Sequence, residues 1–169
     1  MIALETDIDP LWPAAADWET LASRAAAAVA QLLPELANPR LSASLVLTSD
    51  AEVQVLNCEW RGKDEPTNVL SFPMLTQAEL LALAPDGPPV LLGDIALAFQ
   101  TCACEAADKA IPLEAHAAHL VIHGMLHLAG HDHELSAEAA AKMEALEIKA
   151  LALLGLVDPY GDAGQAEGA

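Results

Sequence analysis

All histidines of the chain fall within one short window, and their spacing suits metal binding. The six residues lie between His116 and His133, and the rest of the 169-residue sequence holds none. Pro112 suits the first turn of a helix, and at about 100° per residue one stripe of that helix collects four of the histidines. The stripe comprises His116, His119, His123 and His127, whereas the other faces carry apolar residues such as Val121 and Met125. We therefore predict a helix over residues 112–129 that packs through an apolar side.

Three of these histidines are candidate ligands of one zinc ion. His127 lies four positions after His123, about 6 Å along a helix axis, so both imidazoles can converge on one ion. Gly130 allows the chain to leave the helix and turn back, which brings His133 to the same point from another direction. Three neutral nitrogens leave a fourth position open for water, the catalytic form of a zinc site. We predict one Zn²⁺ per chain, held by His123, His127 and His133.

The remaining histidines receive other roles. His119 has the same spacing to His123, but it lies about 12 Å along the axis from His127 and so cannot share an ion with it. We assign His119 a supporting or substrate-facing role and expect His116 to be exposed. His131 remains a possible rival ligand. A structural zinc site usually has four protein ligands, often Cys, and no Cys lies near this window, so an open site is favoured.

A peptidase must also be considered, because His-x3-His-x5-His with Gly130 matches the metzincin pattern. Those enzymes carry Glu directly after the first His as the general base. Here that position is Gly124, which has no side chain to move a proton. A peptidase would therefore require a distant carboxylate in place of the missing Glu.

Two longer strings carry a different resemblance. One is His123-Gly124-Met125-Leu126-His127-Leu128-Ala129-Gly130-His131-Asp132-His133, and the other is Arg61-Gly62-Lys63-Asp64-Glu65-Pro66-Thr67-Asn68-Val69-Leu70-Ser71-Phe72-Pro73. Together with Gly93-Asp94-Ile95, and in this order, they resemble the signatures of the YbeY family of bacterial metal-dependent endoribonucleases. The resemblance spans residues 46–155. The family usually has Tyr where this chain has His131, which places an additional titratable group beside the expected metal.

The resemblance implies a small domain related in outline to zincins, which binds zinc and acts on ribosomal RNA in the cytoplasm. Family members are linked to maturation of the 16S rRNA 3′ end and to ribosome quality control. The implied partners are a small-subunit ribosomal protein or an assembly GTPase, with no role for DNA or a membrane. In the family, the residue that matches Arg61 is thought important for cleavage.

The second string supplies candidate substrate contacts. Arg61 offers a planar fork suited to a phosphate, although a salt bridge to Glu59 or Asp64 would be the ordinary alternative. Lys63 is a second candidate phosphate contact, and Asn68 and Ser71 are expected to shape the cleft. Asp94 is expected to orient a ligand histidine through its second ring nitrogen.

The predicted catalytic groups are Arg61 and the metal ligand His123. The metal would activate water while Arg61 stabilises the charge of the transition state. Asp132, His119 and His131 are the open candidates for a general base, and a metal hydroxide alone would be a fourth possibility.

The charge of the chain argues against a conventional nucleic-acid surface. Seven Lys and Arg residues stand against 25 Asp and Glu residues, giving a net charge of −18. So few basic residues can neutralise few phosphates. The alternative function is therefore a ribosome-associated assembly factor with a mainly structural metal, in which protein contacts deliver the RNA.

The strands and helices that the sequence predicts form an α/β (α+β) domain with one short mixed sheet, which must position these residues. Strands are expected at residues 2–8, 40–48, 69–72 and 90–99, and helices at 17–33, 50–60, 101–109, 112–129 and 136–154. We expect one domain over residues 1–157 and a loose tail over 158–169. Three Cys residues form no even-numbered disulfide framework, and no export signal is visible, so a cytoplasmic location is expected.

Overall fold

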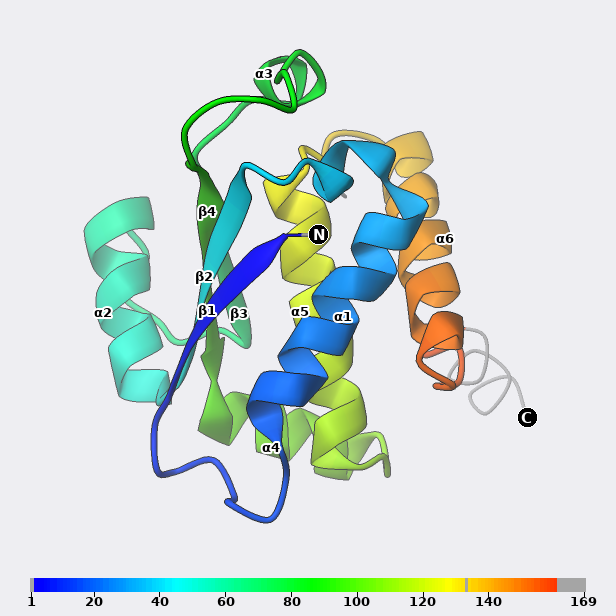
Figure 1. Cartoon of the computed structure of the whole chain (residues 1–169). Helices are drawn as coiled ribbons and strands as arrows, with labels where there is room; N and C mark the ends of the chain where they lie inside the picture. The colour runs from blue at the N-terminus through cyan, green and yellow to red at the C-terminus, as the bar shows by residue number, and fades with distance from the viewer. Residues whose placement is uncertain (1, 133, 161–169) are drawn as a thin grey trace.

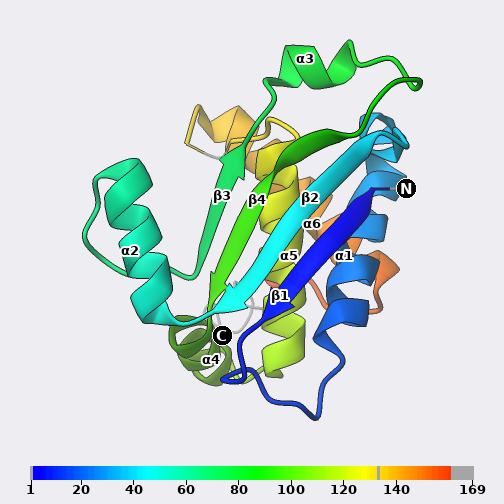
Figure 2. The ribbon, with the colours of Figure 1, turned by 60° about the vertical axis from the view of Figure 1, so that its left-hand side comes forward.

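A four-stranded mixed sheet forms the centre of the computed structural model, which describes residues 2–132 and 134–160. The strands are β1 (Ala3–Ile8), β2 (Leu41–Thr48), β3 (Val69–Pro73) and β4 (Val90–Ala98). Their order is β1-β2-β4-β3, with β1, β2 and β4 parallel and β3 antiparallel to β4 at one edge (Figure 2). The predicted α/β class and mixed sheet are confirmed.

Helices cover both faces of this sheet (Figure 1). α2 (Asp50–Arg61) lies alone on one face, whereas α1 (Trp18–Leu32) and α5 (Leu113–Leu128) cover the other. α6 (Ala137–Leu153) packs on the outside of α1 and α5. The shorter elements are α3 (Gln77–Leu81), α4 (Phe99–Asp108) and a 3₁₀ turn at Pro34–Ala37. Within the described residues, none of the helices is both long and apolar enough to cross a bilayer.

The residue pattern of β2 explains why the sheet has a main core on one side. Leu41, Ala43, Leu45 and Leu47 alternate along the strand and are all buried. They belong to the large core that also contains residues of α1, α5 and α6. The smaller core under α2 contains Val53, Leu70, Ala96 and Ala98. The period of two in the sequence thus predicts correctly which residues of β2 are most buried.

Glycine at position 124 lets α5 approach the sheet closely. A Cβ atom at this position would lie 3.0 Å from two side-chain atoms of Ile95 in β4. Such a contact is shorter than ordinary van der Waals separation, so a larger residue would push the helix away. The position at which metzincins place their Glu therefore faces the sheet in this chain. This geometry supports the argument against a peptidase.

The helix boundaries agree with the capping signals except in α4. Asp17, Ser49 and Ser136 cap α1, α2 and α6 through their side chains, as the sequence predicts. α4 begins directly after β4 at Phe99, two residues earlier than expected, because Asp50 of α2 accepts hydrogen bonds from the backbone N and the hydroxyl of Thr101 (3.0 and 2.6 Å). The segment between β3 and β4 contains the short helix α3, which Thr76 and Glu79 stabilise through a capping box.

Candidate active site

His123 and His127 project from α5 toward a common point. Their Nε2 atoms lie 3.1 Å apart, and their ring centroids are 4.7 Å apart. Two nitrogens that bind one zinc ion tetrahedrally at 2.0–2.1 Å are separated by about 3.3 Å, so the observed spacing fits two ligands of a single ion. The described residues contain no group of three His, Cys, Asp or Glu side chains arranged around one ion. The third predicted ligand, His133, lies outside the described residues.

The carboxylate of Glu147 on α6 contacts the other side of this pair. His123 donates its Nδ1 hydrogen to Oε2 of Glu147 at 2.7 Å, and His119 donates its Nε2 hydrogen to Oε1 at 2.7 Å. The hydroxyl of Tyr160 donates to the same Oε1. A carboxylate only accepts, so the Nδ1 atom of His123 must carry the hydrogen. In the neutral imidazole the Nε2 atom then presents a lone pair toward His127.

Glu147 is 1% exposed, and its hydrogen bonds decide its charge. Burial alone would raise the pKa of Glu147, but the hydrogen bonds from His119, His123 and Tyr160 outweigh burial and lower the pKa to about 2. The carboxylate is therefore ionised at neutral pH. Burial raises the pKa of Tyr160, with Glu147 adding to the shift, so this hydroxyl keeps its hydrogen and acts as the donor.

A polar cavity of about 560 Å³ opens beside the two histidines. Its walls come from the end of α2, the loop that follows, strand β3, α5 and the turn after α5. The lining residues are Arg61, Lys63, Thr67, Asn68, Val69, Ser71, Pro73, His123, His127, Asp132 and Glu134. The structure thus brings both sequence strings to one place, although they are about fifty positions apart in the chain.

Arg61 is the last residue of α2 and is exposed at the cavity. Gly62 follows in the left-handed conformation (φ 71°) and ends the helix. Arg61 forms no ion pair with Glu59 or Asp64, and Asp64 instead accepts a hydrogen bond from Gln54 at 3.0 Å. The structure therefore does not support the alternative role of Arg61 in a local salt bridge.

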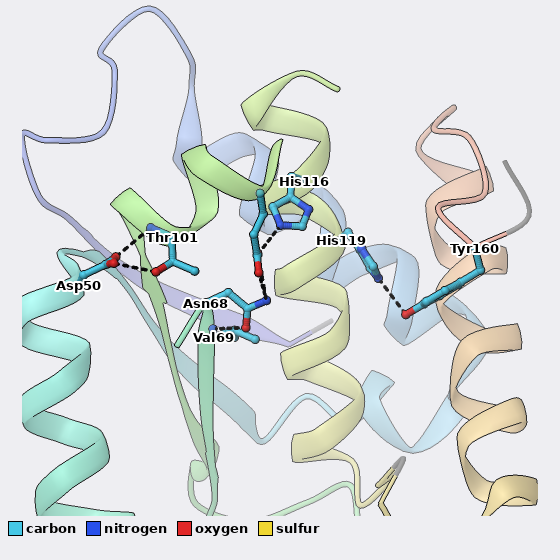
Figure 3. A network of polar contacts seen from close by, with 8 residues as sticks. Asp50, Asn68, Val69, Thr101, His116, His119 and Tyr160 are labelled. Atoms are coloured by element: carbon cyan, nitrogen blue, oxygen red, sulfur yellow. Dashed lines mark hydrogen bonds and ion pairs between the residues drawn. The ribbon is translucent and has the colours of Figure 1, made fainter. Parts of the chain in front are cut away.

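A second network connects the cavity wall to the N-terminal half of α5 (Figure 3). Asn68 donates from Nδ2 to Glu105 at 3.0 Å, and His116 donates from Nε2 to the same carboxylate oxygen at 2.8 Å. Oδ1 of Asn68 accepts the backbone hydrogen of Val69 at 2.7 Å. These contacts hold the amide of Asn68 against the protein at the start of β3.

The sequence profile of a family described as Endoribonuclease YbeY matches residues 12–155. The chain belongs to this family. A YbeY endoribonuclease of Novosphingobium aromaticivorans is 58% identical over 158 residues, covering 93% of this chain and 95% of the relative. One of Erythrobacter litoralis is 58% identical over 159 residues, covering 94% and 98%.

A solved structure supports the fold. The solution structure of a Thermotoga maritima protein has a TM-score of 0.58 to this chain at 22% identity, covering 98% of this chain and 93% of that protein. The YbeY resemblance drawn from the two strings is confirmed. The curated relatives are named endoribonucleases, which are hydrolases, in agreement with the predicted enzyme class.

Within this YbeY fold, two residues lie elsewhere than expected. The expectation that His116 is exposed is wrong, because its side chain is buried and donates a hydrogen bond to Glu105. Burial lowers the pKa of His116, although Glu105 opposes the shift. Asp94 lines a separate, mostly apolar hollow with Trp60, Phe72 and Met74. The structure does not bring Asp94 to the histidines, and the contact expected from it is made by Glu147 instead.

The other predicted residues divide between the cavity and its surroundings. Ser71, Lys63 and Asp132 line the cavity, and Asp132 also accepts the backbone hydrogen of Glu134 at 2.8 Å. His119 supports Glu147 and does not line the cavity. His131 is half-buried, and burial lowers its pKa. The three described residues of the expected tail include Tyr160, which contacts Glu147.

The sequence analysis missed Glu147, Tyr160 and Glu105. For Glu147 the sequence holds a usable signal. Met143, Glu147, Ala150 and Leu151 occupy positions i, i+4, i+7 and i+8, so an acid stands within the apolar stripe of a helix. Buried acids are rare unless they have partners, and such a position therefore deserves a search for donors. Tyr160 lies beyond the last predicted helix and carries no comparable signal.

Proposed function

We propose that this chain is a zinc-dependent endoribonuclease that cleaves single-stranded ribosomal RNA in the cavity beside His123 and His127. The observation that carries the proposal is the 3.1 Å approach of the two Nε2 atoms at a cavity that Arg61 and Lys63 also line. Membership of the YbeY family supports the same reaction. His133 would complete the ligand set, leaving a position for water.

A bound zinc ion would supply a Lewis acid for a phosphate oxygen and would lower the pKa of a bound water. Arg61 binds the non-bridging oxygens of the scissile phosphate and stabilises the negative charge that grows in the transition state. Lys63, on the same wall, holds a neighbouring phosphate. Asn68 and Ser71 shape the floor of the cavity along β3.

Proton transfer falls to a residue that reaches the cavity. Of the three candidates drawn from the sequence, Asp132 lines the cavity, whereas His119 and His131 do not. Asp132 keeps one carboxylate oxygen for Glu134 and has its other oxygen for a proton from water or from the ribose 2′-OH. We therefore assign Asp132 the role of general base.

The biological role follows from the family together with the charge. We propose that the chain acts in the cytoplasm on the 3′ end of 16S rRNA and in ribosome quality control. A net charge of −18 repels free RNA, whereas it attracts the basic surface of a small-subunit ribosomal protein or an assembly GTPase. Such a partner would present the RNA to the cavity.

Cleavage of purified ribosomal RNA tests this function directly. The zinc-loaded chain should cut the RNA internally, and His127→Ala should lose the activity while remaining folded. Analysis of the new ends distinguishes attack by water, which leaves a linear phosphate, from attack by the 2′-OH, which leaves a cyclic one. Cleavage by His127→Ala at the wild-type rate would refute the proposal.

A further inference from the structure

We propose that Glu147 is a positioning residue for His123, and that His119 and Tyr160 hold the Glu147 carboxylate in place. This inference rests on the proposed zinc site, but it assigns work to three residues that touch neither the substrate nor the ion. The contact at its centre is the 2.7 Å hydrogen bond from Nδ1 of His123 to Oε2 of Glu147.

Placing a carboxylate at position 147 costs free energy. Glu147 is 1% exposed, and the residues that share its stripe on α6 are apolar. A buried carboxylate is expensive unless hydrogen bonds replace its lost water. Here three donors replace it, two histidines and one tyrosine, and none of them is a Lys or Arg. An apolar side chain would fill the same space at lower cost, so the carboxylate has a use beyond packing.

The hydrogen bonds to Glu147 divide between its two carboxylate oxygens. Oε2 accepts from His123, whereas Oε1 accepts from both His119 and Tyr160. Two donors on one oxygen fix the carboxylate, and the fixed second oxygen then sets the ring orientation of His123. The same hydrogen bond requires hydrogen on Nδ1, so the Nε2 lone pair points toward His127. A carboxylate at this ring position also makes the imidazole a stronger ligand.

The chain after α6 turns back toward Glu147. α6 ends at Leu153, and Gly155 follows with φ 77°. The chain then returns so that the hydroxyl of Tyr160 reaches Glu147. Figure 3 shows the same hydroxyl beside the ring of His119. The backbone hydrogen of Tyr160 is held by Asp158 at 2.8 Å. The ring of Tyr160 packs edge-on against His119 with centroids 5.7 Å apart. Residues beyond the last helix thus complete the support of a candidate ligand.

A purely structural network would also join α5 to α6, so the test needs a readout that follows His123 itself. The nitrogen chemical shifts of the metal-free wild-type chain, recorded above pH 8, report which ring nitrogen carries the hydrogen. We expect the Nδ1–H form at His123. Finding the Nε2–H form as the main species would overturn the proposal without the need for any variant.

Zinc affinity, measured by competition with a chelator, supplies the second readout. Glu147→Gln keeps the shape but removes the carboxylate, and it should weaken zinc binding 10- to 100-fold. Tyr160→Phe removes only one hydroxyl and should weaken binding by a smaller factor. The matched control is Glu105→Gln, which removes a carboxylate bound to another buried histidine of α5, and its zinc affinity should equal that of the wild type.

The outcomes separate this inference from the proposed function. Wild-type zinc affinity in folded Glu147→Gln, or an equal loss in Glu105→Gln, would overturn the positioning role. If Glu147→Gln does not fold, an unchanged affinity in Tyr160→Phe overturns the part assigned to Tyr160, and the wild-type tautomer decides the rest. If Glu147→Gln loses zinc affinity as expected but the zinc-loaded wild-type chain does not cut RNA, the positioning role is supported and the proposed nuclease function is refuted.

Discussion

Gly124 of α5 and Ile95 of β4 are in such close contact that a Cβ atom on the glycine would lie 3.0 Å from the isoleucine side chain. Ile95 is 1% exposed and lies in the main core, so it has little room to move. This contact sets the depth at which α5, and with it His123 and His127, lies on the sheet.

The contact predicts how substitutions at the two positions will combine. Gly124→Ala adds helix propensity but overpacks the core, and it should lower the free energy of unfolding by about 1–2 kcal/mol. Ile95→Val removes one of the clashing atoms, so the double variant should be more stable than the sum of the single changes predicts. Denaturant unfolding of the four proteins checks this, and simple additivity would contradict the close packing described here.

Arg61 should matter for cleavage and not for folding. Arg61→Ala removes an exposed side chain without an ion pair to its neighbours, so zinc content and stability should stay at wild-type values. RNA cleavage should fall about a hundredfold, as expected when one charge stabiliser is lost. Arg24→Ala, which removes an exposed arginine from α1, is the matched control and should cleave normally. Equal rates in both variants would make Arg61 a surface residue.

RNA binding by the isolated chain should be weak and should depend little on salt. Each neutralised phosphate contributes a slope of about −0.7 in log K against log salt for single strands, and Arg61 and Lys63 provide about two contacts. Their sum is a slope between about −1 and −2, and screening of the repulsion by the acidic surface flattens it further. A binding titration on naked RNA with a slope steeper than about −4 would require a basic groove that this chain does not have.

His116 should make the stability of the chain depend on pH. Its pKa is lowered from 6.5 by burial, so the unfolded chain takes up a proton at a higher pH than the folded chain does. The contribution of neutral, buried His116 to the free energy of unfolding is therefore complete above pH 6.5 and is lost as the pH falls below it. His116→Gln keeps a donor for Glu105 but does not titrate, so its stability should fall less steeply between pH 7.5 and 5.5. Parallel slopes for the two proteins would refute this role of burial.

The site could be predicted from the sequence where local spacing decides geometry. The i and i+4 histidines of one helix, and the serine and aspartate caps, depend on neighbours in the chain, and the structure places them as expected. The burial of His116 could not be predicted from neighbouring residues, because its partner Glu105 lies on another helix, α4. The prediction that Asp94 orients a ligand histidine was wrong for a different reason. Its neighbour Ile95 packs toward α5, so the alternation of a strand turns Asp94 to the opposite face.

We propose that one zinc ion at His123, His127 and His133 makes this chain a nuclease. The most direct measurement titrates zinc into the metal-free chain and follows metal binding and RNA cleavage in the same samples, with His133→Ala and His116→Gln in parallel. The account predicts that cleavage rises in proportion to occupancy and saturates at about one zinc per chain, that His133→Ala binds no zinc, and that His116→Gln binds it normally. Full cleavage by the metal-free chain, or full zinc occupancy in His133→Ala, would contradict it.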